Sequence, residues 1–166
     1  EKALHLALDA GTRAGLPVLL CGEVFPYPDH QRYWREEIVP RLQGGPHRFL
    51  GPVGFARKRR LLSGARCLLS ASLAPETSSL VAMEALACGT PVVAFPSGAL
   101  AEIVDDCVTG FLVRDAEDMA EAIGAARAID AETCRRVARR RFAAEAMVAR
   151  YAALYERIAA RTAIHA

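Results

Sequence analysis

The sequence predicts a single α/β domain over residues 1–166, with a Rossmann-like, doubly wound parallel sheet and helices on both of its faces. Short apolar runs alternate along the chain with segments of helical periodicity, which is the pattern of βαβ units. The runs are mostly apolar throughout, as expected for strands buried on both faces of a parallel sheet. With 166 residues, of which 52% are hydrophobic and 24% charged, the chain is large enough for one core and unlike a disordered chain. In this fold, ligands bind beyond the carboxyl ends of the strands.

The expected strands are the short apolar runs, each closed by a glycine or a polar turn. They cover residues 16–21, 47–53, 65–71, 92–95 and 110–113. The expected helices cover residues 4–14, 30–42, 55–63, 99–104, 116–128 and 131–160, with one more inside the central stretch of residues 70–95. We expect Pro40 to kink or end the second of these helices, and Asp115 to cap the helix that begins at residue 116.

The central stretch, residues 70–95, contains the strongest local signals in the chain. The cap-type residues Thr77, Ser78 and Ser79 open a helix, because their hydroxyls can accept the free N–H groups of a first turn. Gly89 suits the left-handed position just past the helix end, and Pro91 prevents continuation. A helix that starts beside the carboxyl end of a strand offers free N–H groups and a positive dipole end to an anion. We therefore expect the chemistry of the domain here.

Two glutamates flank the start of this helix, Glu76 in the turn and Glu84 eight residues later. Taken alone, they fit exposed carboxylates of a loop and a helix. They also fit a ligand site, although not a glycosidase pair, because eight helical residues would span ~12 Å and such pairs lie ~5–9.5 Å apart. Two carboxylates that grip different parts of one elongated ligand remain compatible with the spacing.

Composition and spacing exclude several other classes of function. The net charge of +2 and the basic runs at residues 57–60 and 135–141, which lack interleaved aromatics, indicate solvated helix faces and no nucleic-acid partner. The four histidines are too dispersed for a metal set, and the five cysteines are scattered, as in a reduced cytosolic protein. No apolar run approaches the ~20 residues of a membrane span. Neither a Gly-x-Gly-x-x-Gly fingerprint nor a P-loop is present.

A longer pattern resembles the C-terminal, donor-binding half of the retaining family-4 (group 1) glycosyltransferases of the GT-B fold. It is a glutamate, seven residues, a second glutamate and then Ala-x-Ala-x-Gly-x-Pro-Val-Val, here from Glu76 to Val93. The similarity continues downstream through Gly98, Glu102-Ile103-Val104 and residues 109–113. Upstream it covers Gly22, residues 49–53 and Lys2, which matches the family lysine in the turn after the first strand.

The resemblance implies a role for each of these positions. Glu84 would bind the ribose hydroxyls of a nucleotide-sugar donor, and Glu76 would bind hydroxyls of its sugar. The backbone N–H groups of Ser79 and Leu80 would receive the diphosphate. Lys2 would neutralise the leaving diphosphate, so that neither a metal nor another cofactor is required. The remaining donor-binding positions, of which the last two lie where the family places its base pocket, are Gly22, Gly51 and Val53.

The resemblance also implies that the chain is a piece of a longer, two-domain enzyme. The first strand and its arginine, and the N-terminal acceptor-binding domain, are expected to lie outside it, so the isolated domain should not catalyse transfer. The sequence departs from the family pattern at Ala71 and at residues 77–79, where many members carry an aromatic residue and a glycine. A cytoplasmic protein is expected, or in full length one peripheral to the inner face of the membrane. The alternatives are another GT-B enzyme, such as a sugar-nucleotide epimerase or a phosphorylase, and a non-catalytic Rossmann-like nucleotide-binding module.

Overall fold

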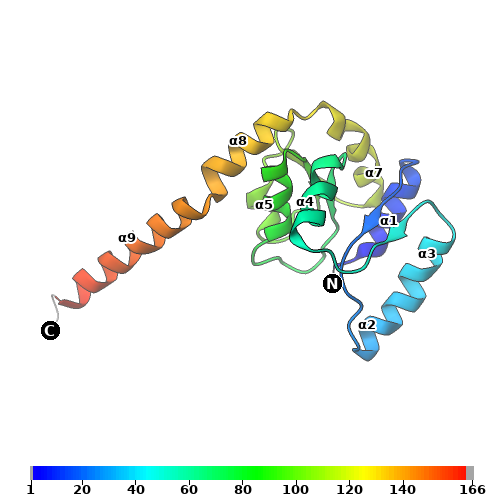
Figure 1. The fold of residues 1–166 in the computed structure, drawn as a ribbon, viewed down its shortest axis with the longest axis horizontal. Helices are drawn as coiled ribbons and strands as arrows, with labels where there is room; N and C mark the ends of the chain where they lie inside the picture. Colours follow the sequence, from blue (N-terminus) through cyan, green and yellow to red (C-terminus); the bar gives the residue numbers. More distant parts are fainter. Residues whose placement is uncertain (1, 164–166) are drawn as a thin grey trace.

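The computed structural model of the chain describes the backbone of residues 2–163 and the side chains of residues 2–160. An α/β body carries one long helix that projects away from it (Figure 1). The strands are β1 (Leu19–Leu20), β2 (Arg48–Phe49), β3 (Leu68–Ser70), β4 (Val92–Ala94) and β5 (Gly110–Leu112). The helices of the first half are α1 (Leu4–Arg13), α2 (Pro28–Tyr33), α3 (Val39–Gln43) and α4 (Phe55–Gly64). Those of the second half are α5 (Leu80–Cys88), α6 (Leu100–Ile103), α7 (Ala116–Ala125), α8 (Ala131–Phe142) and α9 (Ala144–Ala163).

The strands are all parallel, as predicted, but among the described residues they form two sheets instead of one. β1 pairs with β2, and β3 pairs with β4, which pairs with β5. A doubly wound sheet has the strand order 3-2-1-4-5-6, in which the first strand joins the two halves. The two sheets correspond to these halves. No described strand pairs with both β1 and β3, so the two sheets are not joined by hydrogen bonds between strands.

Helices cover both faces of the three-stranded sheet, because neighbouring residues of a strand point to opposite faces. Val93 packs with α1 and α7 in one buried cluster, which includes Ala7, Met119 and Ile123. Val92 and Ala94 pack with α5 and α8 in a second cluster, which includes Leu86, Leu100, Cys134 and Ala138. Each fully buried side chain of this size contributes about 1.5–3 kcal/mol relative to an exposed one. The two clusters therefore fix α1 and α5, the two helices whose starts lie at the candidate site.

Three helix boundaries differ from the sequence predictions. Of the two outcomes expected at Pro40, a kink or a helix end, the end is wrong: α2 continues through a π-helical turn (Trp34–Ile38) into α3. Pro40 lies in the first turn of α3, where a missing N–H is tolerated. The predicted helix over residues 131–160 is broken at Ala143, whose backbone is extended (ψ 138°), so that α8 and α9 are separate. After α7 the chain continues as a short 3-10 turn (Ala126–Ala128).

Two predicted helix ends are confirmed. The Asp115 carboxylate accepts hydrogen bonds from the N–H groups of Glu117 and Asp118, both at 2.9 Å. Gly89 adopts the left-handed conformation (φ 86°) directly after α5, which costs a residue without a Cβ little. Gly89 also lies under the Arg135 guanidinium, which is 2.7 Å from where a Cβ would be.

Candidate functional site

The loop between β3 and α5 is held in place by its own buried hydroxyl and by a neighbouring turn. The buried Ser72 hydroxyl donates to the carbonyl of Ala74 at 3.2 Å, and the Ser97 hydroxyl donates to the same carbonyl at 2.7 Å. This loop follows the carboxyl end of β3, and the turn that supports it follows β4. The site therefore begins at the edge of the sheet where the sequence predicted it.

The backbone of Glu76 is bound directly to the turn at residues 97–99. The Ala99 N–H donates to the Glu76 carbonyl at 2.7 Å, and the Glu76 N–H donates to the Ser97 carbonyl at 3.4 Å. Gly98 has a φ of 58°, and a Cβ there would lie 2.3 Å from the Glu76 carbonyl oxygen. A glycine is therefore required at position 98, since any side chain would push the Glu76 loop away.

The side chain of Glu76 forms an ion pair with Lys2, from the segment before α1. The Glu76 side chain is 13% exposed, whereas that of Lys2 is 65% exposed. The hydrogen bond from Lys2 lowers the pKa of Glu76 below its ordinary value, with a further contribution from Ser72, while partial burial opposes the shift. The Glu76 carboxylate is therefore ionised at neutral pH and can accept hydrogen bonds.

Ala3 joins Lys2 to α1 and has an unusual backbone conformation. It is the residue before α1 and has a left-handed backbone (φ 45°, ψ 43°), although it carries a Cβ and is buried. A left-handed conformation costs an ordinary residue about 1–2 kcal/mol, and such strain is concentrated at functional sites. The cost is offset by the packing of Ala3 beside Ala71 and Ala7 in the first buried cluster.

Glu84 belongs to the second turn of α5 and forms a different ion pair. Lys58 of α4 donates from Nζ to Glu84 Oε1 at 2.6 Å, and the two side chains are 35% and 37% exposed. Since α5 begins at Leu80, Glu76 lies outside the helix and a continuous helical rise does not describe the separation of the two glutamates. Each carboxylate is thus held by its own lysine from its own element.

The start of α5 leaves backbone donors open. Ser79 occupies the predicted cap position, but its hydroxyl makes no capping hydrogen bond, so the hydroxyl cap expected from the sequence is wrong. The first N–H groups that donate back to the Ser79 carbonyl are those of Ala82 and Met83. Leu80 and Val81 precede them and have 72% and 41% exposed side chains. Their N–H groups lack a partner within the helix and point out of its positive end.

The structure also brings together the glycines that follow β1 and β2. The Gly22 N–H donates to the Gly51 carbonyl at 3.1 Å. Neither glycine has an atom within 4 Å of where a Cβ would be, so both border open space. Half-buried Val53 follows them and lies directly before Gly54, the residue that precedes α4.

The predicted site residues thus form three groups at the carboxyl ends of the two sheets: the Lys2–Glu76 pair, the start of α5 with Glu84, and the Gly22–Gly51 pair with Val53. Within the described part of the chain, no hydrogen bond or ion pair joins these three groups. Lys58 was missed by sequence reasoning, which assigned residues 57–60 to a solvated face. Lys58 belongs to a run with Arg57, Arg59 and Arg60, which are all exposed. Nothing in this run indicates that Lys58 contacts a residue 26 positions away.

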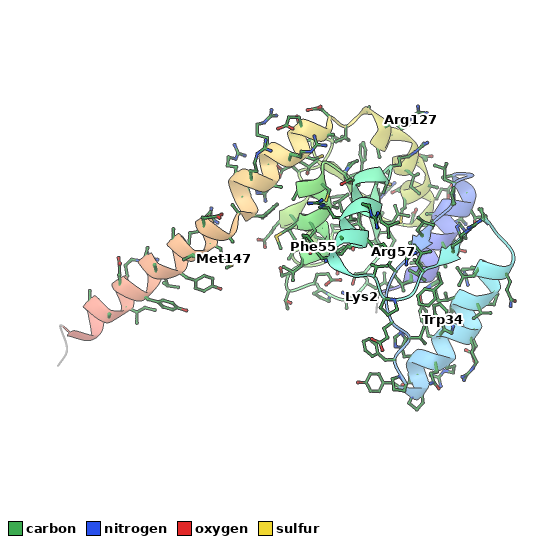
Figure 2. All side chains as sticks on the ribbon, viewed as in Figure 1. Lys2, Trp34, Phe55, Arg57, Arg127 and Met147 are labelled. Carbon is green, nitrogen blue, oxygen red and sulfur yellow. The ribbon has the colours of Figure 1, made fainter. Side chains whose placement is uncertain are left out.

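A hollow of about 430 Å³ lies at the other end of the three-stranded sheet. It is bordered by residues 63–66 before β3, by residues 88–91 before β4, and by Arg127 and Arg135. Figure 2 shows Arg127 on the far side of the body from Lys2. We do not assign the chemistry to this hollow, because the carboxylates, the lysines and the free helix N–H groups all lie at the opposite end.

Within residues 2–163, no three His, Cys, Asp or Glu side chains gather in a way that could hold a metal ion. No described helix is both long and apolar enough to cross a membrane.

Fold and site together define a class: a parallel α/β domain with an uncapped helix start near two lysine-paired carboxylates. The model of the family of glycosyl transferases group 1 matches residues 3–127, and the chain belongs to this family. A D-inositol 3-phosphate glycosyltransferase of Saccharomonospora viridis is 56% identical over 50 residues, which are 29% of this chain and 12% of that protein.

Solved structures of GT-B glycosyltransferases share the fold. AviGT4, a glycosyltransferase involved in avilamycin A biosynthesis, is 28% identical with a TM-score of 0.76, over 96% of this chain and 48% of AviGT4. Anabaena Alr3699/HepE in complex with UDP-glucose is 25% identical with a TM-score of 0.79, over 93% of this chain and 45% of HepE. The chain therefore spans less than half the length of these two proteins. The α/β fold and the group 1 family expected from the sequence are confirmed.

Proposed function

We propose that the chain is the donor-binding half of a retaining family-4 glycosyltransferase, of the hexosyltransferase type. The enzyme would transfer a sugar from a nucleotide sugar to an acceptor glycan or a lipid-linked sugar. Membership of the group 1 family supports this proposal, as does the UDP-glucose complex of the similar HepE structure. The observation that carries it is the open start of α5 between two lysine-paired carboxylates, Glu76 and Glu84.

The proposed donor lies across this helix start. Its diphosphate accepts hydrogen bonds from the N–H groups of Ser79 and Leu80, where the helix dipole favours negative charge. Its ribose hydroxyls donate to Glu84, and its sugar hydroxyls donate to Glu76, whose lowered pKa keeps it ionised. Two separate carboxylates then fix two separate parts of one elongated ligand, so that the sugar carbon is presented in one orientation.

Lys2 is the proposed electrostatic catalyst. Breaking the bond between sugar and diphosphate leaves negative charge on the diphosphate, and a nearby ammonium stabilises that charge more in the transition state than in the ground state. The proposal requires the exposed Lys2 side chain, which pairs with Glu76, to turn toward the donor. With Lys2 and the helix N–H groups supplying positive charge, the proposed reaction needs neither a metal nor another cofactor, and no carboxylate acts as a nucleophile.

The base of the nucleotide is assigned to the space beside Gly22, Gly51 and Val53. The absence of side chains at the two glycines lets a flat ring approach the backbone, and half-buried Val53 offers an apolar edge. This places the base beside the start of α4, from which Lys58 reaches Glu84. The order base, ribose, diphosphate and sugar then follows the surface from Val53 through Glu84 to Glu76.

The whole enzyme is proposed to have a second, acceptor-binding domain in the same chain, because the chain covers less than half of AviGT4 and HepE. The family resemblance implies a donor held between two domains, so the isolated domain is proposed to be inactive in transfer. We further propose a cytoplasmic location, which includes peripheral attachment to the inner face of the membrane.

The test is a calorimetric titration of the longest natural form of the protein with UDP, GDP and ADP. We expect one nucleotide to bind selectively, and Glu84→Gln to weaken its binding about 10- to 100-fold, since hydrogen bonds to a charged group contribute about 1.5–3 kcal/mol. Glu121→Gln makes the same change on the exposed face of α7 and should leave the affinity unchanged. Failure of all three nucleotides to bind, or equal affinity of Glu84→Gln and wild type, contradicts the proposal.

A further inference from the structure

The basic run on α4 is not uniform. Arg57, Arg59 and Arg60 are exposed and form no ion pair with another described residue, whereas Lys58 is half-buried and turned toward α5. Its Nζ lies 2.6 Å from Glu84 Oε1. One member of the run thus has a specific partner on another helix, and that partner is a proposed donor ligand.

The geometry of this pair leaves half of the carboxylate available. Lys58 occupies Oε1 of Glu84, while Oε2 has no hydrogen-bond partner among the described residues. An ionised carboxylate has about four acceptor positions, so it can keep the lysine and still accept hydroxyl groups. The body of α5 is fixed by Ala82 and Ala85, which are completely buried. A glutamate on such a helix still has three side-chain torsions, and the lysine restrains them.

Lys58 is itself placed by the segment assigned to the base. α4 begins two residues after Val53, and the Lys58 N–H donates to the Gly54 carbonyl at 2.9 Å, which closes the first turn. The same rigid turn therefore connects the proposed base-binding segment to the proposed ribose ligand.

We propose that Lys58 is a positioning residue of the donor site, which holds Oε1 of Glu84 so that Oε2 faces the ribose hydroxyls. This inference rests on the proposed function of Glu84. Without the lysine, Glu84 must lose rotamer freedom when the donor binds, which weakens the ribose contact about three- to tenfold. The lysine thereby contributes to selectivity for the ribose without contacting it.

Two simpler roles for Lys58 make different predictions. A tie that only joins α4 to α5 would change the stability of the fold but not the preference for one sugar over another. A lysine that binds the phosphates directly would change the affinity for every nucleotide by the same factor. Selectivity for ribose hydroxyls separates both roles from positioning.

The experiment compares the affinity of the longest natural form for the nucleoside diphosphate that the titration selects with its affinity for the 2′,3′-dideoxy analogue. Both affinities are measured on the same preparation. A reduced fraction of folded protein then affects both equally and does not change their ratio. We expect Lys58→Met to lower the wild-type ratio at least threefold. Lys58→Arg, which keeps a charged donor, should retain the ratio within about twofold, and Arg59→Met on the neighbouring exposed position should leave it unchanged.

Glu84→Gln distinguishes failure of the inference from failure of the proposed function. If Glu84→Gln lowers the ratio and Lys58→Met does not, the positioning role of Lys58 is overturned while the donor site stands. If neither substitution changes the ratio, Glu84 does not bind the ribose, and the proposed function of this residue is overturned with the inference. If Arg59→Met lowers the ratio as much as Lys58→Met does, the effect belongs to general surface charge and the specific role is rejected.

Discussion

Glu76 and Glu84 are of the same residue type and lie on either side of one helix start, yet the structure gives them different surroundings. Glu76 is mostly buried in a loop and is held by its backbone as well as by Lys2. Glu84 is half-exposed on a helix and is held through one side-chain oxygen. In the proposed function, Glu76 would fix the position of the reacting sugar, and Glu84 would bind a part of the ligand farther from the reacting bond.

The ion pair between Lys2 and Glu76 predicts a specific pH dependence. Glu76 has a folded-state pKa below its ordinary value of 4.5. Its stabilising contribution is therefore present above the unfolded-state pKa and is lost as the pH falls through the folded-state pKa. Because Lys2 is well exposed, we expect Lys2→Met to cost at most about 1 kcal/mol at pH 7, and this difference from wild type to disappear at a pH below the lowered pKa.

The measurement is a titration of the Glu76 carboxyl carbon by NMR in both proteins, with urea unfolding at each pH. Lys2→Met should move the pKa of Glu76 upward, toward its ordinary value. The same pKa in wild type and variant would show that Lys2 and Glu76 do not interact in solution.

At the scale of single residues, the sequence predicted local backbone roles better than contacts between side chains that are distant in the chain. Gly89 and Asp115 could be assigned because a left-handed helix end and an aspartate cap are local features. The pairing of Lys58 with Glu84 could not, because it depends on the packing of two helices against each other. The missing cap bond of Ser79 is likewise a matter of side-chain orientation, which residue type does not determine.

At the scale of elements, the site depends on a turn that the sequence pattern did not connect to Glu76. Residues 97–99 follow β4, and they bind the backbone of the Glu76 loop that follows β3. The two loops meet because β3 and β4 are parallel neighbours, whose carboxyl ends lie at one edge. The turn at residues 97–99 therefore supports the Glu76 loop.

Gly98→Ala should damage both stability and binding. A Cβ would contact the Glu76 carbonyl oxygen at 2.3 Å in a backbone with φ 58°, so we expect a loss of about 2 kcal/mol or more in the free energy of unfolding, together with weaker nucleotide binding. Gly124→Ala, in the last turn of α7 with open space around it, should instead raise the free energy of unfolding by up to about 0.5–1 kcal/mol. Urea unfolding measures both. Equal effects of the two substitutions would show that Gly98 does not approach Glu76 closely.

Element boundaries were predictable where a local signal marks them and not where packing decides. The type and order of the helices and strands from α1 to α8 follow the predicted alternation. The break at Ala143 between α8 and α9 is not marked by a glycine or a proline. The π-helical turn before Pro40 lies within a continuous helical segment. Hydrophobic periodicity alone does not distinguish such a turn from the end of a helix.

At the scale of the whole molecule, the two sheets and the helices around them put every proposed ligand contact at one end of the body. α9 leaves the body at the opposite side from α2 and projects away from it (Figure 1), with exposed apolar side chains at Met147, Tyr151 and Tyr155. The alternation of strands and helices predicted the α/β class, but it did not predict that the described strands form two sheets, because strand pairing depends on contacts between distant segments. The fold therefore determines where the proposed ligand would bind, and a few side chains determine which of its groups they would contact.

In the proposed function, the ligand binds at the start of α5 and not in the hollow at the other end of the sheet. Amide hydrogen exchange by mass spectrometry, with and without the selected nucleotide, tests it most directly. We expect slower exchange in peptides that contain the Ser79 and Leu80 amides and in those that cover residues 49–54, with no change at residues 63–66 and 88–91. Protection of residues 63–66 and 88–91 without protection at the start of α5 would contradict the proposed ligand site.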